Sequence, residues 1–126
     1  VDPARRLAEA RNAERWSSVN SILNAYLKYT VDNSGTEPVS LTADTVYHIG
    51  DTDITTNCTA STTEDAIDLG ILVNSGYLSQ MPYDPSSGAS TDTYYWIKKK
   101  GNGRIIVGSC VPETVGGSTP TIQVSR

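Results

Sequence analysis

The sequence lacks several features that define metal-dependent or membrane-spanning proteins. Its 126 residues include no phenylalanine, one methionine, one histidine and two cysteines. One histidine and two cysteines cannot supply a standard four-ligand zinc site. No stretch approaches the ~18 consecutive apolar residues of a transmembrane helix, and residues 1–15 carry charges without the apolar core of a signal peptide. Only carboxylates and hydroxyls remain as catalytic groups. Because they form no recognisable motif, we predict that the chain is not an enzyme.

Basic residues are absent from a long internal stretch. Residues 30–97 hold ten Asp or Glu residues and no Lys or Arg. The net charge of −4 and the pI near 4.8 argue against a dedicated nucleic-acid-binding protein. The basic residues lie near the N-terminus and after residue 97. This distribution indicates either solvated faces that arose by chance or a molecule with one basic pole and one acidic face.

The clearest element that is present is an N-terminal helix. Asp2-Pro3 places a capping residue before proline at the first helical position. Apolar residues then recur every three or four positions, until the turn-forming sequence Asp32-Asn33-Ser34-Gly35. We predict a helix over about residues 3–31. Its half from Trp16 onward carries a broad apolar stripe that would pack on a sheet, and its first half would protrude.

The rest of the chain predicts short strands in a single domain of residues 1–126. Residues 32–80 are predicted as a connecting region with a short helix near residues 64–73, capped by Thr63, and residues 81–126 as a β-region. Trp16 and Trp96 are expected in the core, where they join helix to sheet. The predicted strands are residues 46–49, 93–98, 104–108 and 121–124. The fold class is therefore α+β, with a long helix on a small antiparallel sheet.

Three stretches of the chain resemble one known family. The first is the alanine- and arginine-rich helix of residues 2–26. The second is residues 67–85, with Gly76-Tyr77-Leu78 followed by Met81-Pro82-Tyr83-Asp84-Pro85. The third is the hairpin from Tyr94-Tyr95-Trp96-Ile97 to Ile105-Ile106-Val107. In their order and residues these stretches resemble the type IV pilin family, which includes the pseudopilins of type II secretion systems.

The resemblance implies a structural subunit of a type IV pilus or a pilus-like filament. Members of the family carry an apolar helical segment before the stretch seen here, and that segment anchors them in the inner membrane before assembly. The implied partners are further copies of the chain, minor pilins and the assembly machinery, and the implied location is an extracellular filament on a bacterial cell. The alternatives are a secretion pseudopilin or a secreted module that binds a surface or DNA.

The resemblance also assigns roles to the helix and to the two cysteines. The residues expected to contact neighbouring subunits are Arg5, Arg6, Leu7, Arg11 and Arg15. In a small extracytoplasmic domain Cys58 and Cys110 are expected to form a disulfide, with two free buried thiols as the alternative.

The sequence also offers two candidate ligand sites. Asp84 and Asp92 lie in one loop and could begin a calcium site, as found in this region of major pseudopilins; the alternative is that they cap turns. No other cofactor is expected. The basic residues Lys98, Lys99, Lys100 and Arg104 form a candidate patch for anionic ligands, DNA among them, or else a solvated hairpin end.

Overall fold

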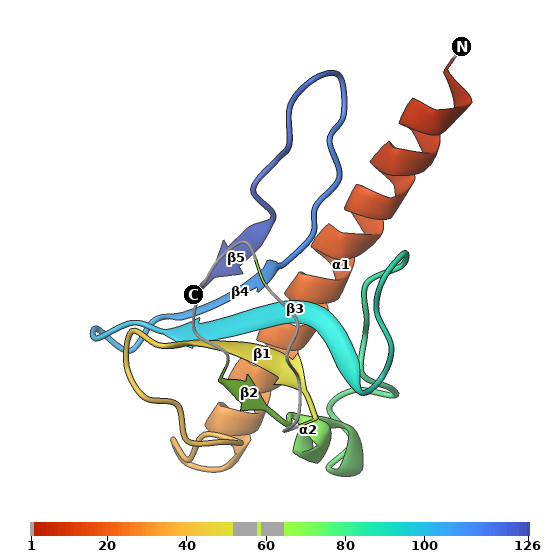
Figure 1. Ribbon diagram of the computed structural model, residues 1–126. Helices are drawn as coiled ribbons and strands as arrows, with labels where there is room; N and C mark the ends of the chain where they lie inside the picture. The colour runs from red at the N-terminus through yellow and green to blue at the C-terminus, as the bar shows by residue number, and fades with distance from the viewer. Residues whose placement is uncertain (1, 52–57, 59–64) are drawn as a thin grey trace.

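A computed structural model describes residues 2–51, 58 and 65–126 (Figure 1). The chain begins with helix α1, Pro3–Asp32. The predicted cap is confirmed: Asp2 precedes the helix, and its Oδ1 accepts a hydrogen bond from the backbone N–H of Arg5 at 3.2 Å. Ser34 and Gly35, both at positive φ, follow the helix and end it where the turn sequence predicts.

The remaining elements build a five-stranded sheet with one short helix. The strands are β1 (Val46–Gly50), β2 (Ala66–Ile67), β3 (Asp92–Lys99), β4 (Ile105–Ser109) and β5 (Gln123–Ser125), and the short helix is α2 (Gly70–Asn74). The sheet order is β2-β1-β3-β4-β5. The pair β1–β2 is parallel and all other pairs are antiparallel. The sheet is therefore mixed, and the α+β class of helix packed on sheet holds.

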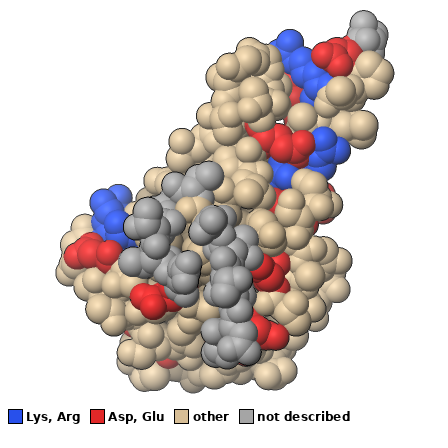
Figure 2. Space-filling view, viewed as in Figure 1, with Lys and Arg blue, Asp and Glu red and all other residues tan. Residues whose placement is uncertain are grey.

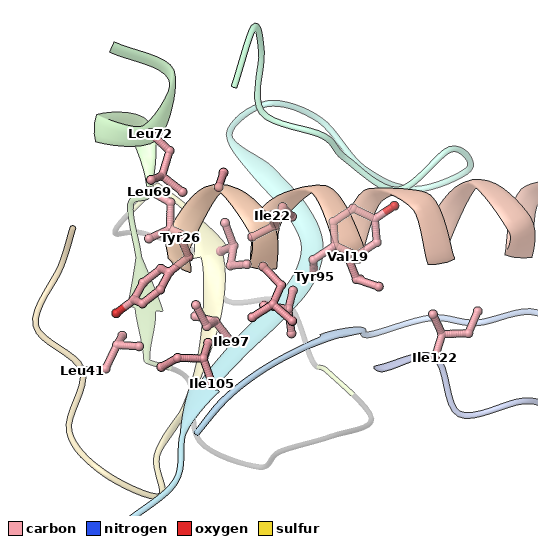
Figure 3. Close-up of a cluster of buried hydrophobic side chains, with 14 residues drawn as sticks. Val19, Ile22, Tyr26, Leu41, Leu69, Leu72, Tyr95, Ile97, Ile105 and Ile122 are labelled. Carbon is pink, nitrogen blue, oxygen red and sulfur yellow. The ribbon is translucent and has the colours of Figure 1, made fainter. Parts of the chain in front are cut away.

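The main core lies between α1 and one face of the sheet (Figure 3). Val19, Ile22 and Tyr26 are each fully buried on α1, and they are spaced by three and four residues. They face alternate residues of the central strands, such as Tyr95 and Ile97 of β3. The second half of the predicted helix therefore packs on the sheet as expected.

A second, smaller core lies on the opposite face of the sheet. It contains Trp96, Ile106 and the disulfide between Cys58 and Cys110. The indole of Trp96 lies directly against Gly108, where a Cβ atom would collide with the ring. Trp96 is thus a core residue, but it packs on the disulfide and not on α1.

Three expectations about local structure are corrected by the structure. The short helix predicted near residues 64–73 is present, but it covers only Gly70–Asn74, and Ala66–Ile67 before it form strand β2; its predicted cap Thr63 lies outside the described residues. The predicted strand at residues 46–49 is confirmed as β1, but the sheet is not wholly antiparallel, because β2 pairs with β1 in parallel. Trp16 is 38% exposed, because the buried face of α1 passes through Arg15 and Val19 instead.

Candidate functional site

The N-terminal half of α1 extends past the sheet, with the connection between β4 and β5 beside it (Figure 1). Of the residues expected to contact other subunits, Arg5, Arg6 and Leu7 are exposed, Leu7 by 57% of its surface. Arg5 pairs with Glu9 one turn later, at 3.2 Å on the exposed surface. Ala8 and Asn12, in contrast, are buried. The N-terminal half of α1 is therefore exposed on one face only, because its other face is buried against the rest of the chain.

Arg15 is the centre of a buried polar network. Its side chain is completely inaccessible to solvent. Nε and Nη2 donate to the two carboxylate oxygens of Asp84 at 2.6 and 3.2 Å, which is the bidentate geometry that favours Arg–carboxylate pairs. Nη2 also donates to Ser86 Oγ at 2.7 Å. The pair thus joins α1 to the loop that leads into β3.

Glu113 connects the same network to the β4–β5 connection. Its Oε2 accepts hydrogen bonds from Arg15 Nη1 and from Arg11 Nε, each at 2.6 Å, and its Oε1 accepts from Arg11 Nη2 at 2.7 Å. The Asn12 side chain donates to the Glu113 carbonyl and accepts from its N–H, at 2.9 and 3.0 Å. We call Arg11, Asn12, Arg15, Asp84 and Glu113 the Arg15 network. It holds two distant loops against α1.

The charges in the Arg15 network stabilise one another. The hydrogen bonds from Arg11, with a further one from Arg15, lower the pKa of Glu113 to about 2. Burial disfavours the charged form of Arg15, but hydrogen bonds to Asp84 and Glu113 outweigh it and raise the Arg15 pKa. Arg11, Arg15 and Glu113 therefore stay ionised at neutral pH. A buried charge is tolerated here because it is paired and hydrogen-bonded.

The structure gives Arg11 and Arg15 a role that sequence reasoning missed. They are expected as contacts to other subunits, yet both bind carboxylates of their own chain, and Arg15 offers no surface at all. A signal was present in the sequence. The buried positions Ala8, Asn12, Arg15, Val19 and Ile22 keep the spacing of three and four residues, so the buried stripe continues through polar residues. This spacing does not show which residues bind Arg11 and Arg15.

Asp84 has a different partner from the expected calcium ion. Both of its oxygens bind Arg15, and Oδ2 also accepts the backbone N–H groups of Ser86 and Ser87 at 3.1 and 3.0 Å. The other expected ligand, Asp92, begins β3, and its Oδ1 accepts from the N–H of Tyr94 at 3.4 Å. A carboxylate that is fully buried against a guanidinium does not fit a calcium ligand.

The predicted patch of basic residues is divided by the sheet. Lys99 forms an ion pair with Glu37 at 3.0 Å, while Lys98 and Lys100 line a groove of about 780 Å³ on the other side. This division follows from strand alternation, which sends neighbouring side chains to opposite faces. Arg104 is exposed in the turn between β3 and β4. The four residues therefore do not form one continuous patch.

The two cysteines form the expected disulfide, with their Cα atoms 4.6 Å apart. His48 lies close enough for its ring to be within 4.8 Å of both sulfur atoms. Sulfur in a disulfide is not the thiolate that binds metals, so this buried cluster has no metal-binding chemistry while the bond is intact.

No protein family, curated protein or solved structure matches this chain. Among the helices that the structure describes, none combines the length and apolar character needed to cross a membrane.

Proposed function

We propose that the chain is a structural subunit of a type IV pilus or a pilus-like filament, and that assembly, not catalysis, is its function. The observation that carries the proposal is α1. Its 30 residues correspond to about 45 Å of helix. Its C-terminal half is fixed in the core, and its N-terminal half extends beyond the sheet with Leu7 exposed. This combination of a head and a projecting helix is what a pilin subunit requires.

In the proposed subunit an apolar helical segment precedes α1 and anchors the protein in the inner membrane. Bundling of such segments would bury their apolar surfaces in the filament centre and leave the heads outside. Repetition of one head-to-tail contact between identical subunits gives an open helical filament. The proposed partners are copies of the chain, minor pilins and the assembly machinery, and the proposed location is the bacterial surface.

The Arg15 network supports this proposal through the rigidity that it gives to α1. In the proposed filament, any force applied to the N-terminal segment reaches the head through α1. The head moves with that segment only if α1 is firmly attached to it. The network joins residues 11–15 of α1 to Asp84 and Glu113, so the helix is attached to the head on two further loops besides the apolar core. Pseudopilins require the same attachment, and the geometry does not favour one kind of filament over the other.

The proposal is tested by restoring the rest of the subunit. The chain is expressed behind a prepilin leader and an apolar pilin helix segment, together with a type IV assembly machinery. We expect filaments in the sheared fraction by electron microscopy, and an antibody to the head should label them along their length. The control is the variant Ala10→Pro of the same subunit, in which α1 is broken. If the unmodified subunit is processed but stays in the membrane as a monomer, the proposal is wrong.

A further inference from the structure

The internal ion pairs change where the basic pole of the molecule lies. Arg5 pairs with Glu9, and Arg11 and Arg15 pair with Glu113 and Asp84. Lys98, Lys100 and Arg104 form no ion pair with any carboxylate that the structure describes. They surround the turn between β3 and β4, which we call the hairpin end of the sheet. On α1, Arg6 and Lys28 also have no ion pair with a described carboxylate, but they are 22 positions apart on the helix. The unpaired positive charges therefore gather at the hairpin end.

A groove opens at the hairpin end, on the face of the sheet that α1 does not cover. Its volume is about 780 Å³. Its apolar walls include Ile106, Pro112 and Pro120, and its basic residues are Lys98 and Lys100. No carboxylate is among its described lining residues. One acidic residue is near: Asp44 accepts a hydrogen bond from the N–H of Gly101 in the turn. The groove nevertheless has a positive balance in a chain of net charge −4.

The other end of the same sheet is acidic. Asp51 directly follows β1 and Asp68 directly follows β2, and both are exposed. We call this the acidic end. Because no Lys or Arg occurs in residues 30–97, strands β1 and β2 carry no lysine or arginine to offset these charges. Figure 2 shows basic side chains at one side of the head with acidic ones beside them, and further acidic side chains toward the other side. The lysines without ion pairs thus lie at one end of the strands, and Asp51 and Asp68 lie at the other.

We infer that the groove is a contact between copies of this chain, in which Lys98 and Lys100 of one copy receive Asp51 and Asp68 of the next. This inference rests on the proposed function. Complementary charges at opposite ends make the contact heterologous, and a heterologous contact that does not close on itself builds a filament. Electrostatic complementarity also fixes register and speeds correct encounters.

Other anionic partners fit the groove less well. Stacking of sugars or of single-stranded bases requires an exposed aromatic face. The tryptophan of this groove, Trp96, is only 5% exposed and lies against Gly108. A nucleic acid would also meet a chain that is acidic overall. A protein surface with carboxylates needs no stacking, and the chain itself supplies one.

Zero-length carbodiimide cross-linking of the head domain tests the contact directly. Copies labelled with ¹⁵N are mixed with unlabelled copies, so that mass spectrometry separates cross-links between copies from those within one. At about 20 mM salt, where screening is weak, we expect mixed-isotope cross-links that join Lys98 or Lys100 to Asp51 or Asp68. We expect their yield to fall about tenfold in about 500 mM salt. Cross-links that map elsewhere would overturn the inference.

Charge reversal in pairs makes the test specific. K98E/K100E and D51K/D68K heads should each lose the contact at least tenfold, and an equal mixture of the two should regain it, since the charges are then complementary again. K28E reverses an exposed charge on α1, away from both ends of the sheet, and should leave the contact unchanged. Circular dichroism checks that every variant is folded. An equal loss in K28E, or no recovery in the mixture, would contradict the inference.

The same variants separate this inference from the proposed function. If unmodified subunits form filaments and K98E/K100E subunits form them equally well, the groove is not the contact, although the chain is still a filament subunit. If unmodified subunits form no filament while the heads cross-link as expected, the filament proposal fails and the contact between copies stands as an association of heads.

Discussion

Replacing Asp84 with asparagine should destabilise the domain strongly, because it leaves the Arg15 guanidinium buried with half of its negative partners. Both side chains have zero exposure, and they share two hydrogen bonds. Asparagine keeps the shape but removes the charge, and its NH₂ group would face donors of Arg15, Ser86 or Ser87. Removing one partner of a buried ion pair typically costs about 3–5 kcal/mol. Glu113 stays bound to Arg15, so we expect about 3 kcal/mol.

Urea unfolding of the oxidised chain, followed by far-ultraviolet circular dichroism, measures this loss. A cost of about 3 kcal/mol is a large part of the ~5–15 kcal/mol that stabilises a typical domain, and it should lower Tm by about 10 °C for a chain of this length. The control is Glu9→Gln, which breaks the exposed pair with Arg5 and should cost less than about 0.5 kcal/mol.

A double replacement distinguishes the pair from simple crowding. Arg15→Met with Asp84→Leu removes both charges and fills the space with apolar atoms. Such replacements of buried ion pairs are often close to neutral, so the double variant should be clearly more stable than Asp84→Asn alone. If Asp84→Asn costs less than about 1 kcal/mol, or if the double variant is the least stable of the set, the reasoning about the Arg15 network is refuted.

Three further predictions test other parts of the fold. Replacing Cys58 and Cys110 with alanine opens a loop with a sequence separation of 52 and should cost about 2–4 kcal/mol in urea unfolding; an unchanged midpoint would contradict it. The pKa of Glu113 is lowered from 4.5 to about 2, so its ionisation stabilises the fold fully above pH 4.5 and progressively less as the pH falls toward 2. Glu113→Gln should therefore remove part of the acid sensitivity measured by Tm against pH, and an identical slope would count against this. Gly108→Ala places a methyl group into the Trp96 ring and should cost about 1–3 kcal/mol, whereas Gly103→Ala, with open space around it but a positive φ, should cost about 1 kcal/mol.

The elements that could be predicted from the sequence are those fixed by local chemistry. The cap at Asp2 and the turn at Ser34-Gly35 act within a few residues of themselves, and α1 ends within one residue of its expected limit. The hairpin of β3 and β4 is likewise local, since its strands are joined by a short turn. Strand β2 was missed because its two residues pair in parallel with β1, about twenty positions earlier, and its apolar pattern alone also suits a helix.

The Arg15 network could not be predicted from the sequence, for a different reason. The residues that bind Arg15 lie 69 and 98 positions away, and nothing about Asp84 or Glu113 distinguishes them locally from other loop carboxylates. Arg15 itself was expected at the surface, because arginine is almost never buried unless it is paired. Only the fold brings its partners to it, so periodicity alone could have shown a buried position there but not an ion pair.

The ion pairs of the Arg15 network determine which charges remain for a contact between subunits in the proposed filament. Residues 2–15 carry four arginines against three carboxylates, which gave the impression of a basic helix. Once Asp84 and Glu113 are bound to it, the same region holds more carboxylates than arginines, and Arg6 is its one arginine without an ion pair to a described carboxylate. In the proposed filament the larger attraction then comes from the cations gathered at the hairpin end, which lie opposite the acidic end of their own sheet. A filament contact driven by charge is therefore expected along the strands and not along the helix.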